Sequence, residues 1–292
     1  MSLREGEQIR RVEGRIRMAG GAEVFQRSWV GWAPQRLLVL VHGLGEHSGR
    51  YDEMAVWFAR RGFAVYALDL RGHGRTPGRP ADVADFGFFI DDVGEFVETV
   101  RAIHPGFPCC VVGHSMGGLI TASWLIERAP SIDRIALSGA ALKLAPSVSQ
   151  SRLLMARVLG RLAPRLRFAA NLELEGLSRD PDVIRLYCED PLVHGRISAG
   201  MGLGMIERQQ RVFARAGRVD IPILVLHGEE DSLGAAEGSR EFFAGLSRDG
   251  AEGSALRVYP GLRHEIFNEP EREQVWTDLL GWLDASPGEW SG

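Results

Sequence analysis

The chain has 292 residues, of which 45% are apolar and 25% charged, an ordinary globular balance that excludes a disordered chain, a fibre and a coiled coil. Its 34 basic and 38 acidic residues give a net charge of −4, whereas nucleic-acid-binding proteins are usually strongly basic, so we expect no nucleic-acid partner. A chain of this length can bury roughly three quarters of its surface and needs no metal or disulfide to fold.

The number of cysteines and the composition of the N-terminal residues indicate the cellular compartment of the protein. An odd, low number of cysteines, Cys109, Cys110 and Cys188, predicts no disulfide framework. Residues 1–11 are polar and show no signal peptide, and no apolar stretch approaches the ~20 residues of a membrane span. We therefore expect a soluble, cytoplasmic protein.

Short apolar runs alternate with longer amphipathic stretches along the chain. The runs that predict strands are 36–42, 63–70, 109–113, 134–138, 221–227 and 255–259. The stretches with helical spacing are 51–61, 86–103, 116–129, 235–246 and 271–283. This alternation predicts an α/β fold with a mostly parallel, doubly wound central sheet flanked by helices. Segments 14–18 and 22–29 alternate more strictly and predict an antiparallel edge of that sheet.

One connection is too long for a compact domain. About 80 residues separate the strand that ends near Ser138 from the next one. Apolar residues recur at helical spacing within it, between Leu153 and Leu162. We expect residues 145–216 to form an inserted helical cap, and residues 1–144 and 217–292 to form the core.

A nucleophile motif lies between a strand and a helix. Residues 113–117 (GHSMG) fit the pattern G-x-S-x-G, with Ser115 at its centre. An apolar strand precedes the motif and an amphipathic helix follows it, which is the setting of a nucleophile elbow. The glycines suit a strained turn whose neighbours leave no room for side chains. The pattern by itself leaves open a glycine-rich turn with an incidental serine.

Two backbone N–H groups are candidates for an oxyanion hole. Another apolar strand ends in His42-Gly43-Leu44-Gly45, where the glycines let the backbone turn inward. A tetrahedral intermediate needs preorganised N–H donors, one from this loop and one from the residue after the nucleophile. We expect Leu44 and Met116 to supply them. An ordinary glycine turn is the alternative.

The base and the acid are expected after the last two strands. His264 follows the final strand, at the sheet edge where Ser115 is expected. The loop after the preceding strand contains Glu229, Glu230 and Asp231, of which we favour Asp231, with Glu230 as the alternative. The order Ser115, Asp231, His264 is that of an α/β-hydrolase triad. We interpret the other histidines that follow strands as structural, namely His42, His47, His73, His114 and His227.

Several sequence blocks resemble those of one known family. They are HGLGEHSGRY (42–51), DLRGHGRTPG (69–78), GHSMGG (113–118), HGEEDSLG (227–234) and LRHEIFNE (262–269). Together they resemble the monoacylglycerol lipase and lysophospholipase group of the α/β-hydrolase superfamily. Residues 177–195 are similar to the cap segment of this group, whereas residues 146–174 match nothing that we can align, which leaves the preferred acyl-chain length open.

The resemblance implies a serine hydrolase of lipid-like carboxylic esters that uses neither a cofactor nor a metal. It supports Ser115, Asp231 and His264 as the triad, with Leu44 and Met116 as oxyanion donors. Glu46 and Arg50 match family residues near the polar end of the pocket. We expect them to orient a glycerol head group, and an equal alternative is that Glu46 holds the loop in place.

The leading hypothesis is hydrolysis of a monoacylglycerol to glycerol and fatty acid through an acyl-enzyme. A lysophospholipase or a short- to medium-chain carboxylesterase would share this machinery and differ only in pocket shape. A non-catalytic receptor for a small ligand on the same fold is the alternative of another class. The sequence does not determine the head group, the regiochemistry or the oligomeric state.

The cap also contains a basic amphipathic stretch. Arg157, Arg161 and Arg165 share one face of the expected helix, and a leucine- and valine-containing stripe (Leu154, Val158, Leu162) shares another. Such a helix can lie on an anionic lipid surface, which predicts peripheral membrane contact through the cap. The alternative is that the apolar face covers the pocket and the arginines are solvated.

Overall fold

An eight-stranded sheet forms the centre of the molecule. The computed structural model describes residues 9–18, 20–143, 149–246 and 252–285. The strand order is β1-β2-β4-β3-β5-β6-β9-β10. The strands are β1 (Arg10–Arg17), β2 (Glu23–Val30), β3 (Arg36–Val41), β4 (Phe63–Asp69), β5 (Cys109–His114), β6 (Arg134–Ser138), β9 (Ile223–Gly228) and β10 (Ala255–Tyr259).

Most of the sheet is parallel, and only its first two strands differ in direction. β1 pairs antiparallel with β2, and β2 pairs antiparallel with β4. The remaining neighbours, from β4 through β3, β5, β6 and β9 to β10, are parallel. The predicted antiparallel edge and the mostly parallel sheet are therefore confirmed. Every residue of β4 is buried, as expected for a strand covered on both faces.

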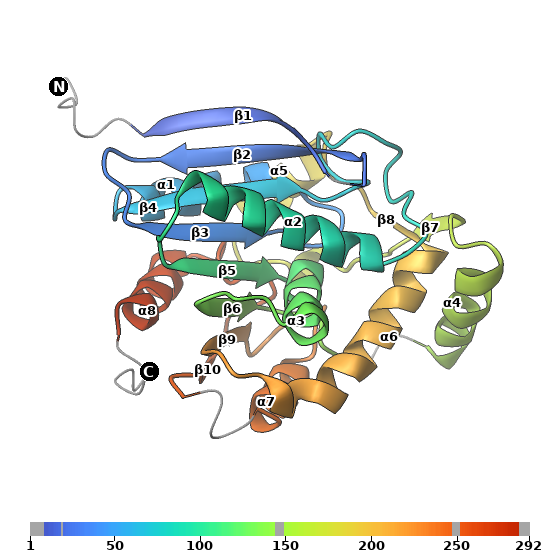
Figure 1. Ribbon diagram of the computed structural model, residues 1–292. Helices are drawn as coiled ribbons and strands as arrows, with labels where there is room; N and C mark the ends of the chain where they lie inside the picture. Colours follow the sequence, from blue (N-terminus) through green and yellow to red (C-terminus); the bar gives the residue numbers. More distant parts are fainter. Residues whose placement is uncertain (1–8, 19, 144–148, 247–251, 286–292) are drawn as a thin grey trace.

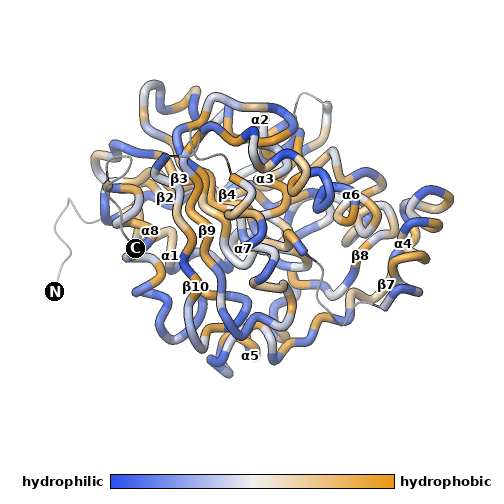
Figure 2. Tube along the Cα trace, turned by 90° about the horizontal axis from the view of Figure 1, so that it is seen from below, coloured by the Kyte–Doolittle hydropathy of each residue, from blue (hydrophilic) through white to orange (hydrophobic). Residues whose placement is uncertain are grey.

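Helices cover both faces of this sheet (Figure 1). α1 (Asp52–Ala59) and α8 (Arg272–Asp284) share one hydrophobic cluster with one set of strand side chains. α2 (Gly87–Ile103), α3 (Met116–Arg128) and α7 (Ala236–Ala244) contribute to a second cluster on the opposite face. In Figure 2 the strands at the centre are mostly hydrophobic, and hydrophilic segments lie toward the outside. The bounds of each of these five helices lie within two residues of those predicted from the sequence.

The segment between β6 and β9 lies beyond the carboxyl ends of the parallel strands (Figure 1). It contains α4 (Gln150–Leu162), α5 (Pro181–Glu189) and α6 (Ala199–Arg215). A small antiparallel ribbon of β7 (Arg167–Ala169) and β8 (Arg196–Ser198) was not expected from the sequence. Within the described ranges there are also three 3₁₀ helices: η1 (Ser48–Tyr51), η2 (Leu174–Gly176) and η3 (Ala216–Arg218).

The segment predicted as a cap is unevenly attached to the rest of the molecule. Residues 145–148 of that prediction lie outside the described residues. α6 packs against α3 as well as α4, and its Met201 and Val212 belong to the same buried cluster as α2 and α3. α4 lies farther out, with Leu154 and Leu162 largely exposed. The carboxyl half of the segment is therefore built onto the core, whereas its amino half extends outward.

Candidate active site

Ser115 joins the end of β5 to the start of α3 in a strained backbone conformation. Its φ of 52° and ψ of −119° lie in a region that residues with a Cβ rarely occupy. A Cβ on Gly117 would collide with the carbonyl oxygen of Val41, and one on Gly113 would lie 2.5 Å from the Gly117 carbonyl oxygen. Only glycines at these positions allow so sharp a turn, which places Ser115 in the wall of a pocket at the carboxyl edge of the sheet.

The two expected oxyanion donors line the same pocket. Met116 is the first residue of α3, so its N–H has no carbonyl within the helix to bind. Leu44 lies between two anchored glycines. The N–H of Gly43 donates to Glu46 Oε1 at 2.6 Å, and the carbonyl of Gly45 accepts from the N–H of His194 at 2.9 Å. These bonds fix the loop on both sides of Leu44.

His264 and Asp231 are hydrogen-bonded to one another. His264 Nδ1 lies 2.7 Å from Asp231 Oδ2, and the carboxyl group of Asp231 is fully buried. The other carboxylate oxygen, Oδ1, accepts from the N–H groups of Leu233 and Gly234, each at 2.8 Å. This arrangement holds the imidazole with its proton on Nδ1, so that Nε2 is the nitrogen free to act as a base. His264 lines the pocket together with Ser115.

Burial and neighbouring charges shift the pKa values of His264 and Asp231 in opposite directions. Burial by itself would lower the pKa of His264, but the Asp231 carboxylate outweighs it and raises the pKa above the ordinary 6.5. Burial would raise the pKa of Asp231, yet His264 and His227 together hold it well below its usual 3.8. Asp231 therefore stays ionised at neutral pH and stabilises a cationic His264.

The alternative acid and the remaining histidines occupy other environments. Glu230 is exposed to solvent, one residue from the buried Asp231 carboxylate. His227, which we interpreted as structural, also contacts the acid, because its Nε2 lies 2.9 Å from Asp231 Oδ2 and its Nδ1 lies 2.7 Å from Ser239 Oγ. Burial, followed by the nearby His264, lowers the pKa of His114 to about 4, so His114 is neutral.

Glu46 and Arg50 belong to a buried network rather than standing free at the pocket. Glu46 Oε1 accepts from Gly43 and Tyr51, and its Oε2 accepts from Arg50 at 2.9 Å. Arg50 in turn forms a two-pronged bond to Glu265, at 2.6 and 2.7 Å. Burial would raise the pKa of Glu46, but Arg50 lowers it to about 2. Glu46 and Glu265 line the pocket, whereas Arg50 lies behind them and over the ring of Tyr187, at 4.8 Å from its centre.

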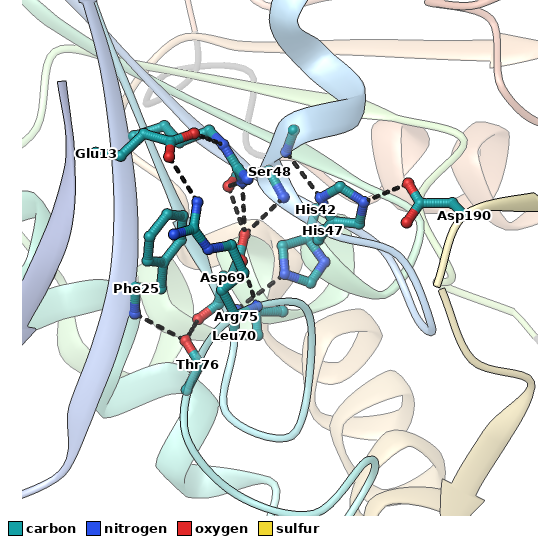
Figure 3. Close-up of polar contacts among 12 residues, drawn as sticks. Glu13, Phe25, His42, His47, Ser48, Asp69, Leu70, Arg75, Thr76 and Asp190 are labelled. Atoms are coloured by element: carbon teal, nitrogen blue, oxygen red, sulfur yellow. Dashed lines mark hydrogen bonds and ion pairs between the residues drawn. The ribbon is translucent and has the colours of Figure 1, made fainter. Parts of the chain in front are cut away.

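A second buried carboxylate supports the same loop from behind (Figure 3). Asp69, at the end of β4, accepts hydrogen bonds from the N–H and the hydroxyl of Ser48 and from the N–H of Arg75. His42 Nε2 accepts from the N–H of Leu70 at 2.9 Å. His47 reaches the other way, with its Nε2 2.8 Å from Asp190 Oδ2 in the segment after α5. Sequence reasoning missed Asp69, because nothing local marks it as buried.

The pocket at Ser115 lies beside a larger apolar chamber. The pocket itself has a volume of about 100 Å³, and the adjoining chamber has about 520 Å³. Three residues, Leu44, Leu172 and Met205, line both cavities. Side chains from α4, β7, β8 and α6 line the chamber, and none of its lining residues among those the structure describes is charged. A small pocket that contains the polar groups of the site thus adjoins a larger apolar chamber.

Tyr187 of α5 also lines the pocket, and sequence reasoning did not identify it. Its side chain is buried, and the hydroxyl has no hydrogen-bond partner among the described residues. Burial, followed by the Glu46 charge, raises the pKa of Tyr187, so the hydroxyl keeps its proton. A buried hydroxyl without a partner is unfavourable unless a ligand binds it. The helical spacing of α5 gives no signal for this role.

Comparison with known proteins identifies the family. The model of the family described as serine aminopeptidase, S33 (Hydrolase_4) matches residues 33–271. The chain belongs to this family. The α/β-hydrolase superfamily and the resemblance to monoacylglycerol lipases are thereby confirmed, and so is the prediction of a carboxylic ester hydrolase.

Several relatives match over nearly the whole chain. A monoacylglycerol lipase of Mycolicibacterium smegmatis is 38% identical over 90% of this chain and 94% of its own length. The monoglyceride lipase of Rattus norvegicus is 31% identical over 91% of this chain and 88% of its own. The crystal structure of Paleococcus ferrophilus monoacylglycerol lipase is 33% identical, has a TM-score of 0.81, and covers 89% of this chain and 98% of its own.

The choice between two neighbouring acids gives a first prediction. We expect Asp231→Asn to lower kcat about 10⁴-fold, because an amide cannot hold His264 in the required tautomer. The matched control is Glu230→Gln, which removes an exposed carboxylate one position away and should change kcat less than about twofold. Steady-state hydrolysis of a p-nitrophenyl ester measures both. A large loss in the Glu230 variant alone would assign the acid to Glu230.

The raised pKa of His264 predicts the pH dependence of the free enzyme. A general base must be unprotonated, so kcat/KM should rise with pH and reach half its maximum above pH 6.5, the ordinary histidine value. Asp231 stays ionised at these pH values, so its titration adds no second inflection to the pH profile of kcat/KM. The measurement is kcat/KM from about pH 5 to about pH 9. A flat profile, or a midpoint below 6.5, would argue against His264 as the base.

Proposed function

We propose that this hydrolase cleaves monoacylglycerols to glycerol and a fatty acid through an acyl-enzyme on Ser115. The observation that carries the proposal is the pair of adjoining cavities, one small and partly polar at Ser115 and one larger and lined mainly by apolar residues. A monoacylglycerol has the same two parts, a compact polar head and a long apolar chain. The relatives named monoacylglycerol lipase add support.

In the proposed first step, His264 Nε2 takes the proton from Ser115 Oγ as the oxygen attacks the ester carbonyl. The carbonyl oxygen becomes an oxyanion, which the N–H groups of Leu44 and Met116 stabilise. The intermediate then expels the glycerol oxygen, to which His264 returns the proton, leaving an acyl-Ser115. Water, deprotonated by His264, attacks the acyl carbon, and collapse releases the fatty acid and restores Ser115.

The polar end of the pocket is proposed to bind the glycerol head. Tyr187, Glu46 and Glu265 line this end, and hydroxyl and carboxylate groups suit the glycerol hydroxyls, which both donate and accept hydrogen bonds. Glu46 and Glu265 with Arg50 carry a net charge of −1, from −1 − 1 + 1, at neutral pH. An anionic phosphate would be repelled there. The pocket therefore favours glycerol over the phosphate ester of a lysophospholipid.

A lysophospholipase remains the second candidate within the same mechanism. A phospholipase of Bacillus subtilis is 30% identical over 88% of this chain and 98% of its own length. Because the triad would be shared, only the head-group preference separates the two activities.

The decisive test is hydrolysis by the purified protein of monoacylglycerols, triacylglycerols, lysophosphatidylcholine and p-nitrophenyl esters. We expect the highest kcat/KM for monoacylglycerols and loss of all turnover in Ser115→Ala with the fold retained. Preference for lysophosphatidylcholine would shift the assignment to the second candidate, and turnover of short esters alone would indicate a carboxylesterase. Absence of turnover would favour a ligand-binding receptor on this fold.

The Tyr187 hydroxyl gives a test of head-group binding. We expect Tyr187→Phe to lower kcat/KM for monoacylglycerols about three- to tenfold, the usual effect of one neutral hydrogen bond. The p-nitrophenyl esters lack the glycerol and serve as the matched control, so their kcat/KM should not change. An equal loss on both substrate types would mean that Tyr187 supports the loop instead of the head group.

We also propose that residues 145–216 act as a cap that brings the pocket to a lipid surface. Leu154 and Leu162 of α4 are 63% and 79% exposed, and Val158 and Leu166 also face solvent. Arg161 and Arg165 pair with Glu207 and Asp82 yet remain about two-thirds exposed. In the part of the chain that the structure describes, no helix is long and apolar enough to cross a membrane. Contact would therefore be peripheral, through α4.

Vesicle binding tests this surface. We expect the protein to sediment with anionic phosphatidylglycerol vesicles at low salt, and Leu154→Ser together with Leu162→Ser to reduce binding at least about fivefold. Both side chains are exposed, so the double variant should fold normally. Neutral phosphatidylcholine vesicles are the control for the arginine contribution. If the protein does not bind anionic vesicles at low salt, the proposed lipid contact is wrong.

A further inference from the structure

Three glycines fall within the first two turns of α6, and two of them are required by close packing. A Cβ on Gly200 would collide with the carbonyl oxygen of Ala84, and a Cβ on Gly204 would collide with Phe86. These two glycines let α6 approach the loop that precedes α2. Their presence in a helix therefore has a structural reason.

Gly202 has no such reason. A Cβ built on it would lie 3.8 Å from Ala156 Cβ and 4.0 Å from Ile197 Cδ1, which are ordinary van der Waals distances. The backbone there is helical, so any L-residue could adopt it. A glycine inside a helix is less favourable than an alanine, because it loses more conformational freedom on folding. The packing of the protein thus tolerates a side chain that the sequence leaves out.

The space that this missing side chain leaves belongs to the apolar chamber. Gly202 lines the chamber on α6, and Ala156 of α4 and Ile197 of β8 line it nearby. A Cβ at position 202 would thus meet, within 4 Å, only side chains that line the chamber, and a larger residue there would take up space beside them.

We infer that Gly202 sets the usable length of the acyl-binding chamber and thereby determines which acyl chains the enzyme accepts. The inference rests on the proposed function, because it takes the chamber to hold the acyl part of the substrate. Each methylene group excluded from apolar burial lowers binding about fourfold. A side chain of four carbons at this position would therefore penalise long chains, which fill the chamber, much more than short chains.

The test compares Gly202→Leu with wild type on p-nitrophenyl esters of four to eighteen carbons and on the matching monoacylglycerols. We expect kcat/KM for the longest chains to fall at least about tenfold while that for the four-carbon ester stays within about twofold. Gly202→Met adds comparable volume with a more adaptable side chain and should give the same trend if the leucine variant folds poorly. Gly202→Ala should raise Tm and should change the dependence of kcat/KM on acyl-chain length less than Gly202→Leu does.

Gln210→Leu provides the matched control, because it adds the same apolar side chain at an exposed position of the same helix. Its chain-length profile should match wild type. A Gly202→Leu profile that is unchanged, or that falls equally for short and long chains, would overturn the inference. The p-nitrophenyl ester series separates this outcome from failure of the proposed function. If the enzyme hydrolyses these esters but not monoacylglycerols, the head-group assignment is wrong. The ester series still tests the role of Gly202 in that case.

Discussion

The buried carboxylate of Glu46 is the interaction on which the candidate site depends. It binds the N–H of Gly43, the hydroxyl of Tyr51 and the guanidinium of Arg50, and Arg50 carries the connection on to Glu265 beside His264. One chain of hydrogen bonds thus joins the loop after β3 to the loop after β10. Removing one member of such a buried ion pair typically costs about 3–5 kcal/mol, because the partner charge is left unpaired. The network therefore ties the positions of the two loops to each other.

The segment between β6 and β9 is tied to these same loops. The N–H of His264 donates to the Gly176 carbonyl, the N–H of Glu265 donates to the Leu177 carbonyl, and the N–H of His194 donates to the Gly45 carbonyl. His47 and Asp190 add a side-chain contact. Residues 176–194 are therefore part of the wall of the site. The outer helix α4 lacks comparable attachments to these loops among the described residues, and its side chains Leu154 and Leu162 are largely exposed.

Most of the fold followed from local patterns in the sequence. The apolar runs placed the strands of the parallel sheet, since a strand covered on both faces needs a continuous apolar stretch. The glycine pattern around Ser115 predicted the sharp turn between β5 and α3. The short ribbon of β7 and β8 escaped prediction, because three residues are too few to show a period. The preference for Asp231 over Glu230 came from the loop position and was then supported by the resemblance, whereas the burial of one and the exposure of the other appear only in the fold.

The sequence by itself determined the order of the elements, the strained serine turn and the residue types that face the sheet edge. These features depend on residues within a few positions of one another, whose spacing expresses helical and strand geometry directly. Only the tertiary structure decided that Tyr187 lines the pocket, that Asp69 supports the loop after β3, and that Gly202 lines the chamber. Each of these depends on contacts between segments distant in the chain, which no local pattern records.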